Sequence, residues 1–425
     1  MSVDPSPARP TRPRLLVDVG LLRRHRPFRA LFVARLMSVF SLGILVIAVP
    51  VQIQALTGSV WQVSVATALD GAGMAGGMLV GGVLADRHDR RALILVARAL
   101  CGVGFVLLAL NGLLAAPSLA ALYLVSAWDG FFGALGLTAL MAATPALVGR
   151  ADLAAAGALT MITVRMGAIL APLVGGAVLG FGGVTANYLL AGLGTLATLI
   201  PLTRLPTLRP PPAAPQHPLR AIAAGLAYLG RDRLVAAVML AGTLHATFGA
   251  TRVLFPALAS MNRLDGVATG SLYAAVPLGA MLGAVTSGWV ARVRRPGVLL
   301  LGAIGVCAAA VAALGAAPGL PALLIVLAVL GYAGSIAALV QAILVQTHTP
   351  EAMLGRVSSL WSAQDIVGET AGAMTLGAFA RLSPLLGAAW LGLGGLAAAG
   401  ALLVGCGPLR RVRGEGPPDG RRVDV

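Results

Sequence analysis

The stretch TPALVGR at residues 144–150 recurs as TPEAMLGR at residues 349–356, with one residue inserted. A second pair, GVLADR at 82–87 and GWVAR at 288–292, shows the same relation. Each stretch follows an apolar segment of membrane-spanning length, and the members of both pairs lie 205–206 residues apart. The sequence therefore indicates two tandem copies of a six-helix repeat. Two parallel repeats with a site between them are the architecture of membrane transporters.

The composition is that of an integral membrane protein. Of the 425 residues, 58% are hydrophobic and only 11% are charged, whereas soluble domains carry about 25% charged residues. We expect an all-α membrane protein with twelve transmembrane helices in two six-helix, pseudo-symmetric bundles, because about 20 apolar residues in a helix span a bilayer. The twelve apolar runs lie at residues 29–55, 62–85, 92–114, 119–142, 156–180, 184–204, 233–257, 269–291, 297–316, 320–345, 357–380 and 383–406.

The spacing of these runs divides the chain into five parts. They are a basic cytoplasmic tail at 1–28, an N-terminal bundle at 29–205, a cytoplasmic linker at 206–232, a C-terminal bundle at 233–407 and a second cytoplasmic tail at 408–425. Proline at 210–212 makes the linker an extended spacer that lets the halves rock. The nucleotide-binding pattern GxxxxGK[ST] cannot occur without Lys, so we expect ion coupling, no cofactor and no enzyme activity.

The net charge of +16 comes from arginine alone, because none of the 31 basic residues is Lys. Most of them lie in the two tails, the linker or alternate loops, and we place Arg98 in the first turn of a helix that leaves those loops. Only Arg263 and Arg381 fall in the opposite loops. The positive-inside rule then predicts a multi-pass protein of the cytoplasmic (inner) membrane with both termini in the cytoplasm. The basic tail is expected to bind the lipid bilayer rather than nucleic acid.

Six ionisable residues inside the apolar runs are the candidates for a mechanism: Asp70, Asp129, Arg165, Arg252, Asp365 and Glu369. Each costs about 2.5–3.5 kcal/mol if it faces lipid, so these residues must pair or line a wet cavity. We expect Asp129 to pair with Arg165, and Arg252 with Glu369. Asp365 and Glu369 share one helix face, where mutual repulsion favours protonation of one carboxylate. The expected proton-coupling residues are Glu369, Asp129, Asp365 and Asp70.

Cationic and aromatic residues form the expected substrate site. Its members are Arg35, Trp128, Asp129, Arg165, Arg252 and Tyr332. Aromatic faces beside Arg suit a flat, anionic, aromatic substrate through stacking and cation–π contacts. Two alternatives stay open: Asp129 and Arg165 form a static pair that fixes helix register, and the aromatic residues serve helix packing.

The loop GVLADRHDRR at 82–91 resembles the major facilitator superfamily signature GxLxDRxGRR. The matching residues imply a gating motif that latches the cytoplasmic side; they are Gly82, Asp86, Arg87, Arg90 and Arg91. Asp86 is expected to cap the third helix and to oppose its positive end. Asp89 stands where the signature has Gly, which departs from the tight turn expected there.

In the fifth helix, GAILAPLVGG at 167–176 resembles the antiporter motif GxxxGPxxGG, with Ala171 in place of one Gly. Pro172 removes a backbone hydrogen bond and kinks the helix, while Gly167, Gly175 and Gly176 permit close packing. The resemblance implies export. An ordinary kinked and tightly packed helix is the alternative.

Longer strings in both halves resemble the enterobactin exporter family: VPVQIQ at 49–54, WDGFF at 128–132, RVLFPAL at 252–258 and YAAVPLGA at 273–280. The similarity runs from about residue 28 to 405 and implies a proton-coupled exporter of a catecholate siderophore that works by alternating access. Its partners are then a small-molecule substrate and protons, and a monomer is expected. The matching membrane positions are Arg35, Asp129, Arg165, Arg252 and Glu369.

Two further classes of function stay open. A multidrug or macrolide-type efflux pump of the same superfamily would tolerate uncharged substrates. A non-transporting receptor or enzyme would need a catalytic constellation or a soluble domain, and the sequence offers neither. Asp70 and Asp365 stand apart from the resemblance, because carboxylates are not expected at those positions in the family.

Overall fold

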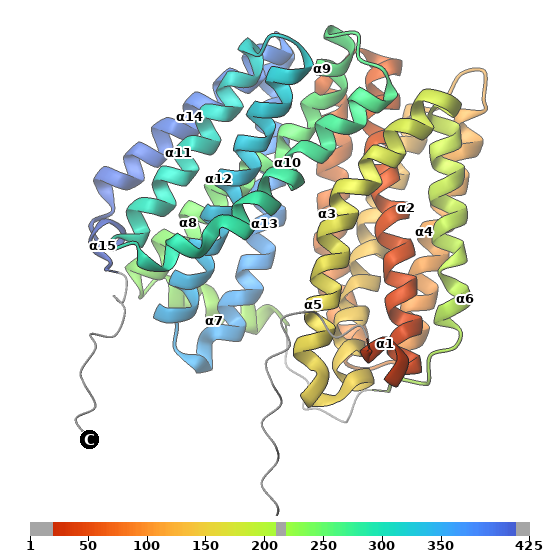
Figure 1. Cartoon of the computed structure of the whole chain (residues 1–425), viewed down its shortest axis with the longest axis horizontal. Helices are drawn as coiled ribbons and strands as arrows, with labels where there is room; N and C mark the ends of the chain where they lie inside the picture. The colour runs from red at the N-terminus through yellow and green to blue at the C-terminus, as the bar shows by residue number, and fades with distance from the viewer. Residues whose placement is uncertain (1–19, 210–217, 414–425) are drawn as a thin grey trace, which may run out of the picture.

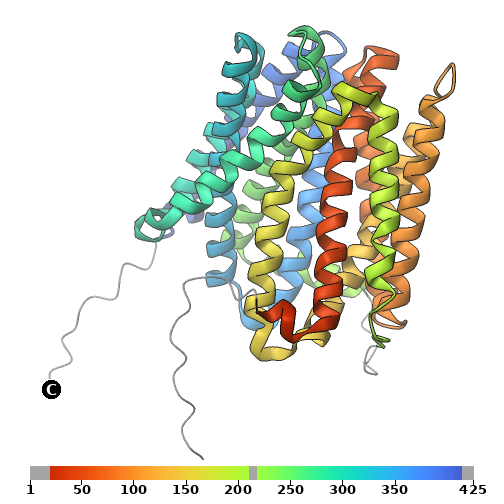
Figure 2. The same cartoon turned by 45° about the vertical axis from the view of Figure 1, so that its right-hand side comes forward.

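The computed structural model describes residues 20–209 and 218–413, which form helices with no strand among them. The first part of the basic tail, the proline-rich part of the linker and the last part of the C-terminal tail lie outside these described residues. The helices form two bundles side by side, one from each half of the chain (Figure 1). The long helices run from one end of the molecule to the other (Figure 2). The predicted all-α membrane fold is therefore confirmed.

The first bundle contains six helical rods, although three of them belong to one continuous helical segment. Its helices are α1 (Leu21–Arg24), α2 (Arg26–Thr57), α3 (Val60–Ala85), α4 (Arg90–Gly112), α5 (Leu119–Ala197) and α6 (Leu199–Leu202). The long α5 is broken at Gly149 and Gly183, whose φ angles are 70° and 68°. Only Gly adopts this left-handed conformation at low cost, so these two residues fold α5 into three rods.

The second bundle repeats this arrangement with more interruptions. Its helices are α8 (Arg233–Thr247), η1 (Phe248–Leu254), α9 (Phe255–Met261), α10 (Gly266–Thr286), η2 (Ser287–Arg292), α11 (Pro296–Ala313), η3 (Leu314–Ala316), α12 (Gly319–His348), α13 (Glu351–Ala380), α14 (Pro384–Gly405) and α15 (Gly407–Arg411). The linker helix α7 (Pro218–Leu229) packs on α13, where Gly225 meets Leu360. The hydroxyl of Tyr228 donates to the carbonyl of His348 at 3.4 Å, which ties this helix to the second bundle.

Ten segments of the described residues are long and apolar enough to span a membrane. One of them, Asp152–Leu202, is itself broken at Gly183 into two rods. One further long helix, α13, is not among these ten segments, because its polar residues lower its hydropathy. Together these rods make twelve. Large apolar side chains such as Phe181 and Val404 lie exposed on the helices (94% and 76%), as lipid-facing residues do.

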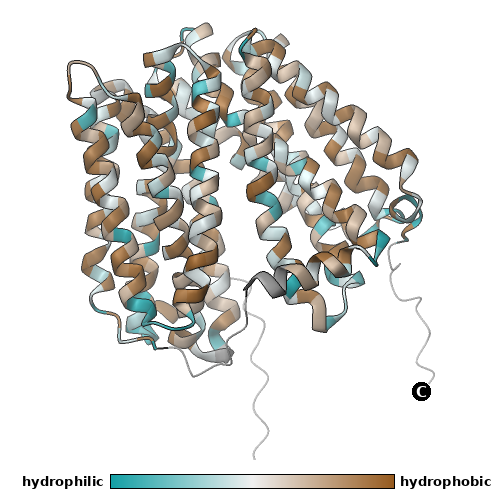
Figure 3. Cartoon of the chain, turned by 180° about the vertical axis from the view of Figure 1, so that it is seen from behind, coloured by the Kyte–Doolittle hydropathy of each residue, from teal (hydrophilic) through white to brown (hydrophobic). Residues whose placement is uncertain are grey.

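The two ends of the molecule differ in charge. One end, which we call the arginine-rich end, carries the connections at 86–89, 203–209 and 292–295. The opposite end carries Arg263 and Arg381. Hydrophilic residues are most evident at the arginine-rich end, and hydrophobic ones run along the long helices (Figure 3).

The bundles meet near the opposite end and diverge toward the arginine-rich end (Figures 1 and 3). On one seam the backbone of Gly176 in α5 lies against Gly266 and Gly270 of α10, so that a Cβ at any of the three would overlap the neighbouring backbone. On the other seam Gly377 of α13 lies against Ser64 of α3. Small residues let helix backbones approach in this way. The bundles are therefore packed against each other near the opposite end and lie further apart toward the arginine-rich end (Figure 1).

A cation–π contact adds to the second seam. The guanidinium carbon of Arg381, at the end of α13, lies 3.9 Å from the ring centroid of Trp61 on α3. The two residues belong to different bundles, so the contact exists only while this end is closed. Such contacts at exposed sites contribute about 0.5–1 kcal/mol.

We predict that Arg381→Gln shifts the conformational equilibrium toward opening at this end by roughly two- to fivefold, since 1.4 kcal/mol corresponds to a factor of ten. The measurement is the maleimide labelling rate of a Ser64→Cys reporter, whose native side chain is buried in the seam, in a background without the native cysteines. Arg263→Gln, at the other arginine of this end, is the matched control. Equal labelling rates in the two variants would show that the contact does not hold the seam.

Candidate functional site

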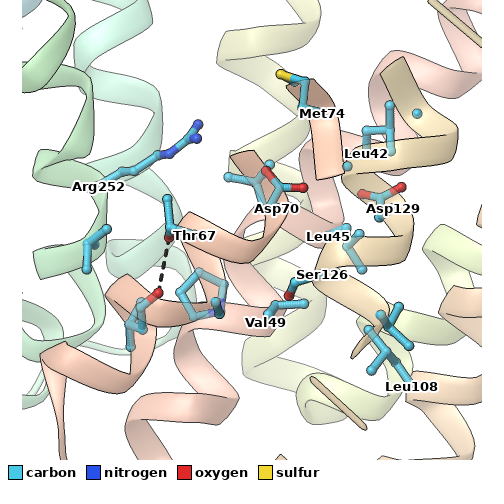
Figure 4. A pocket seen from close by; sticks show the side chains of 18 of the residues that line it. Leu42, Leu45, Val49, Thr67, Asp70, Met74, Leu108, Ser126, Asp129 and Arg252 are labelled. Atoms are coloured by element: carbon cyan, nitrogen blue, oxygen red, sulfur yellow. Dashed lines mark hydrogen bonds between the residues drawn. The ribbon is translucent and has the colours of Figure 1, made fainter. Parts of the chain in front are cut away.

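A cavity of about 330 Å³ lies between the bundles. Its wall comes from α2, α3, α4 and the first rod of α5 on one side, and from η1 and α10 on the other. Most of the lining is apolar, with Leu45, Val49 and Leu137 among its members. The ionisable side chains in the wall are Asp70, Asp129, Arg252 and Tyr273. Figure 4 shows Arg252 extending from the second bundle toward Asp70 of the first.

Arg252 is positioned by a local break in its helix. It lies in η1, a 3-10 turn between α8 and α9, and Pro256 follows four residues later. Proline has no backbone N–H to donate to the carbonyl of Arg252, and its ring crowds that turn. The guanidinium forms an ion pair with Glu369 of α13. The predicted Arg252–Glu369 pair is therefore confirmed, and its side chains are 42% and 30% exposed.

Asp70 faces this ion pair from the first bundle. Its charge interacts electrostatically with Arg252, Glu369 and Asp129. Gly130 of α5 contacts the backbone and the carboxylate of Asp70, leaving no room for a Cβ. This close packing fixes α3 against α5, and it holds the carboxylate of Asp70 at the cavity wall.

Asp129 has different neighbours from those predicted. It interacts electrostatically with Arg98 of α4 and lies beside Cys101. No ion pair joins Asp129 to Arg165 among the described residues, and Arg165 is exposed on the second rod of α5. The expectation of an Asp129–Arg165 pair is therefore wrong, because Asp129 lies beside α4 whereas Arg165 is exposed.

Arg98 is a functional candidate that the sequence reasoning missed. It lies eight residues after the start of α4 at Arg90, which is about 12 Å along a helix. It is only 8% exposed, so it does not lie in the first turn of this helix as predicted. Arg35 of α2, a predicted substrate residue, lies within electrostatic range of Arg98. The depth of Arg98 inside an apolar run was the signal that could have identified it.

The predicted aromatic residues pack between helices. The indole N–H of Trp128 donates to the carbonyl of Leu100 at 2.9 Å, and its ring packs on Phe132 with centroids 4.7 Å apart. The hydroxyl of Tyr332 accepts a hydrogen bond from Thr286 at 3.0 Å. Neither residue belongs to the cavity wall. These contacts favour the packing interpretation over a role in substrate binding.

Asp365 lies one turn before Glu369 on α13 and is exposed. The two carboxylates interact electrostatically, as expected from their spacing. Asp365 is not part of the cavity wall. It therefore adds negative charge next to the Arg252–Glu369 pair without lining the cavity.

The loop at 82–91 binds backbone within the first bundle. The guanidinium of Arg90 donates to the carbonyls of Ala85 and Ala142 at 3.2 and 2.9 Å. Arg91 donates to the carbonyl of Thr203 at 2.7 Å. These contacts join α3, α5 and the segment after α6 at the arginine-rich end. Gly82 lies near the end of α3 with open space where a Cβ would stand.

The cap of α4 is Asp89, not Asp86 as predicted. The carboxylate of Asp89 accepts hydrogen bonds from the backbone N–H groups of Arg91 and Leu208, at 3.0 and 2.8 Å. Asp86 instead occupies the C-cap of α3. The reason is that α4 begins at Arg90, so the residue directly before it takes the capping position.

The stretch at 167–176 faces two other helices. Gly167 lies against Val39 of α2, and Gly175 lies against the backbone of Ile44. Gly176 contacts α10 across the seam, where the carbonyl of Pro172 also approaches Gly270. These residues place the second rod of α5 between its own bundle and the other one.

Comparison with known proteins identifies close relatives along nearly the whole chain. Residues 22–413 match the family described as transmembrane secretion effector. The chain is 48% identical over 404 residues to the enterobactin exporter EntS of Shigella boydii, covering 95% of this chain and 97% of that protein. It is 47% identical over 407 residues to the enterobactin exporter EntS of Citrobacter koseri, covering 95% and 98%.

Solved structures share the fold at much lower identity. The nucleoside transporter NupG superposes with a TM-score of 0.74 at 12% identity, covering 91% of this chain and 99% of that one. The peptide transporter POT in complex with sulfate gives a TM-score of 0.71 at 17% identity, covering 92% and 96%. At these identities the likeness is one of fold alone.

We predict that Asp89→Ala lowers the free energy of unfolding by about 1–2 kcal/mol, the usual cost of losing an N-cap. The measurement is the thermal unfolding midpoint of the purified protein in detergent. Asp86→Ala removes an equal charge from the same loop and should cost less, since it does not cap α4. An equal loss in both variants would contradict the assignment of the cap.

Proposed function

The chain belongs to the family of transmembrane secretion effectors, within the major facilitator superfamily, and on that premise we propose that it exports an enterobactin-like catecholate siderophore across the cytoplasmic (inner) membrane. The observation that carries this proposal is the near-half identity to enterobactin exporters over 95% of the chain. So extended a match includes both bundles and the residues of the cavity between them. The chain is a transporter and not an enzyme.

The proposed orientation places the arginine-rich end in the cytoplasm, with both termini on that side. The positive-inside rule supports this orientation, since the connections at 86–89, 203–209 and 292–295 all contain arginine and all lie at this end. The bundles then lie further apart on the cytoplasmic side, where an exporter takes up its cargo (Figure 1). Each chain holds a complete cavity, which supports a monomer as the transporting unit.

Alternating access follows from the two seams. The bundles close on each other through Gly176 and Gly377 at the end that faces outward in this orientation. Rocking about the central cavity opens those seams and closes the cytoplasmic side. The cargo is thereby exposed to one side of the membrane at a time.

Protons are the proposed driving ion, and Glu369 is the proposed carrier. Its carboxylate is bound to Arg252, which lines the cavity. With Glu369 deprotonated, its ion pair holds Arg252 at the cavity wall, where the guanidinium can donate to a substrate oxygen. Protonation of Glu369 breaks this pair, frees Arg252 to leave the wall and weakens cargo binding, so that proton and cargo exclude each other as antiport requires.

Deletion of the gene in an iron-starved strain should reduce the secretion of catechols into the medium, and the gene on a plasmid should restore it. The reason is that the cell loses its route for the cargo if this chain carries it. Unchanged secretion together with new sensitivity to macrolides or other drugs would contradict siderophore export and favour the multidrug pump.

Glu369→Gln should abolish pH-driven uptake of the siderophore into inverted membrane vesicles, because the amide cannot carry a proton. Glu351→Gln is the matched control: it removes a carboxylate from the first turn of the same helix, away from the cavity wall. Undiminished coupling in the Glu369 variant would rule out this residue as the carrier.

A further inference from the structure

The described cavity wall carries more carboxylates than guanidiniums, with Asp70 and Asp129 against Arg252. Arg252 is already bound by Glu369, and Asp129 interacts electrostatically with Arg98. Among the described residues, Asp70 has no ion pair of its own. It interacts with Arg252, whose guanidinium is paired with Glu369.

Resting on the proposed function, we propose that Asp70 is the residue of the cavity that discriminates between the metal-free, protonated siderophore, which it admits, and the anionic metal complex, which it excludes. A free catechol is uncharged and carries two O–H donors. When three catechols bind one trivalent metal ion they release six protons, and the complex carries three negative charges. A carboxylate accepts hydrogen bonds from the first species and repels the second.

Asp70 is suited to discriminate because its helix is closely packed at this point. Gly130 of α5 lies against the backbone and the carboxylate of Asp70, where a Cβ would not fit. The carboxylate of Asp70 lies in the cavity wall on the same side as Asp129 (Figure 4). A second carboxylate, Asp129, lines the same wall and adds to the negative field.

The rest of the wall supports the same cargo. Leu45, Val49, Val63 and Leu137 provide apolar surface on which uncharged aromatic rings can pack. Thr67 and Ser126 are polar but carry no charge that could offset a trianion. The lining therefore favours rings with O–H donors over phenolate oxygens bound to a metal.

The test compares binding of enterobactin with binding of its gallium(III) complex, which has the charge of the iron complex without its paramagnetism. The protein is the full chain in nanodiscs at pH 8, and affinity is read from intrinsic tryptophan fluorescence. The complex should bind at least roughly tenfold more weakly than the free siderophore, since like charges a few ångströms apart repel strongly in a partly buried site.

Asp70→Asn keeps an acceptor oxygen but removes the charge, so it should tighten binding of the gallium complex while changing affinity for the free siderophore little. Glu351→Gln removes a charge away from the cavity and should leave the ratio of the two affinities as in the wild type. Equal binding of both species by the wild type, or an unchanged ratio in Asp70→Asn, overturns this inference alone. Binding of neither species overturns the proposed function along with it.

Discussion

A charge inside an apolar bundle needs a partner, and the arrangement of the two halves depends on how this chain supplies one. Arg252 is bound by Glu369 within its own bundle and is faced by Asp70 from the other. The same guanidinium thus takes part in both the internal packing of one half and the contact between halves. A proton or a ligand that changes the Arg252–Glu369 pair also changes the interaction of Arg252 with Asp70. This gives the proposed coupling between the cavity and the positions of the bundles its physical basis.

Close approach of the two bundles is the second requirement, and small residues permit it. On one side the backbone of Gly176 lies against Gly266 and Gly270, and on the other Gly377 lies against the small side chain of Ser64. These contacts are dispersion contacts between small groups, each weak and easily broken. A seam of this kind separates at low cost, whereas interlocked large side chains would not.

The sequence alone predicted the twelve helices, the duplication and the Arg252–Glu369 pair. Those features depend on apolar length and on depth along a helix, which can be counted from the residue numbers. Which neighbouring helix a given face meets cannot be counted in this way. For that reason Asp129 was paired with Arg165, whereas the structure places Arg98 beside it. Trp128 was expected at the substrate but packs on Phe132 and α4 for the same reason. The exact start of α4 likewise decided between Asp86 and Asp89 as its cap.

The charge of the cargo determines which part of the proton gradient drives the cycle. If the siderophore leaves uncharged and a proton enters, each cycle moves one positive charge inward. The membrane potential then contributes about 2.3 kcal/mol per 100 mV, in addition to the pH difference. A cargo bearing three negative charges would add its own outward movement to this, but it would first have to enter a wall lined by Asp70 and Asp129. If Asp70 excludes such a cargo as proposed, the siderophore leaves neutral and proton entry alone sets the electrical work.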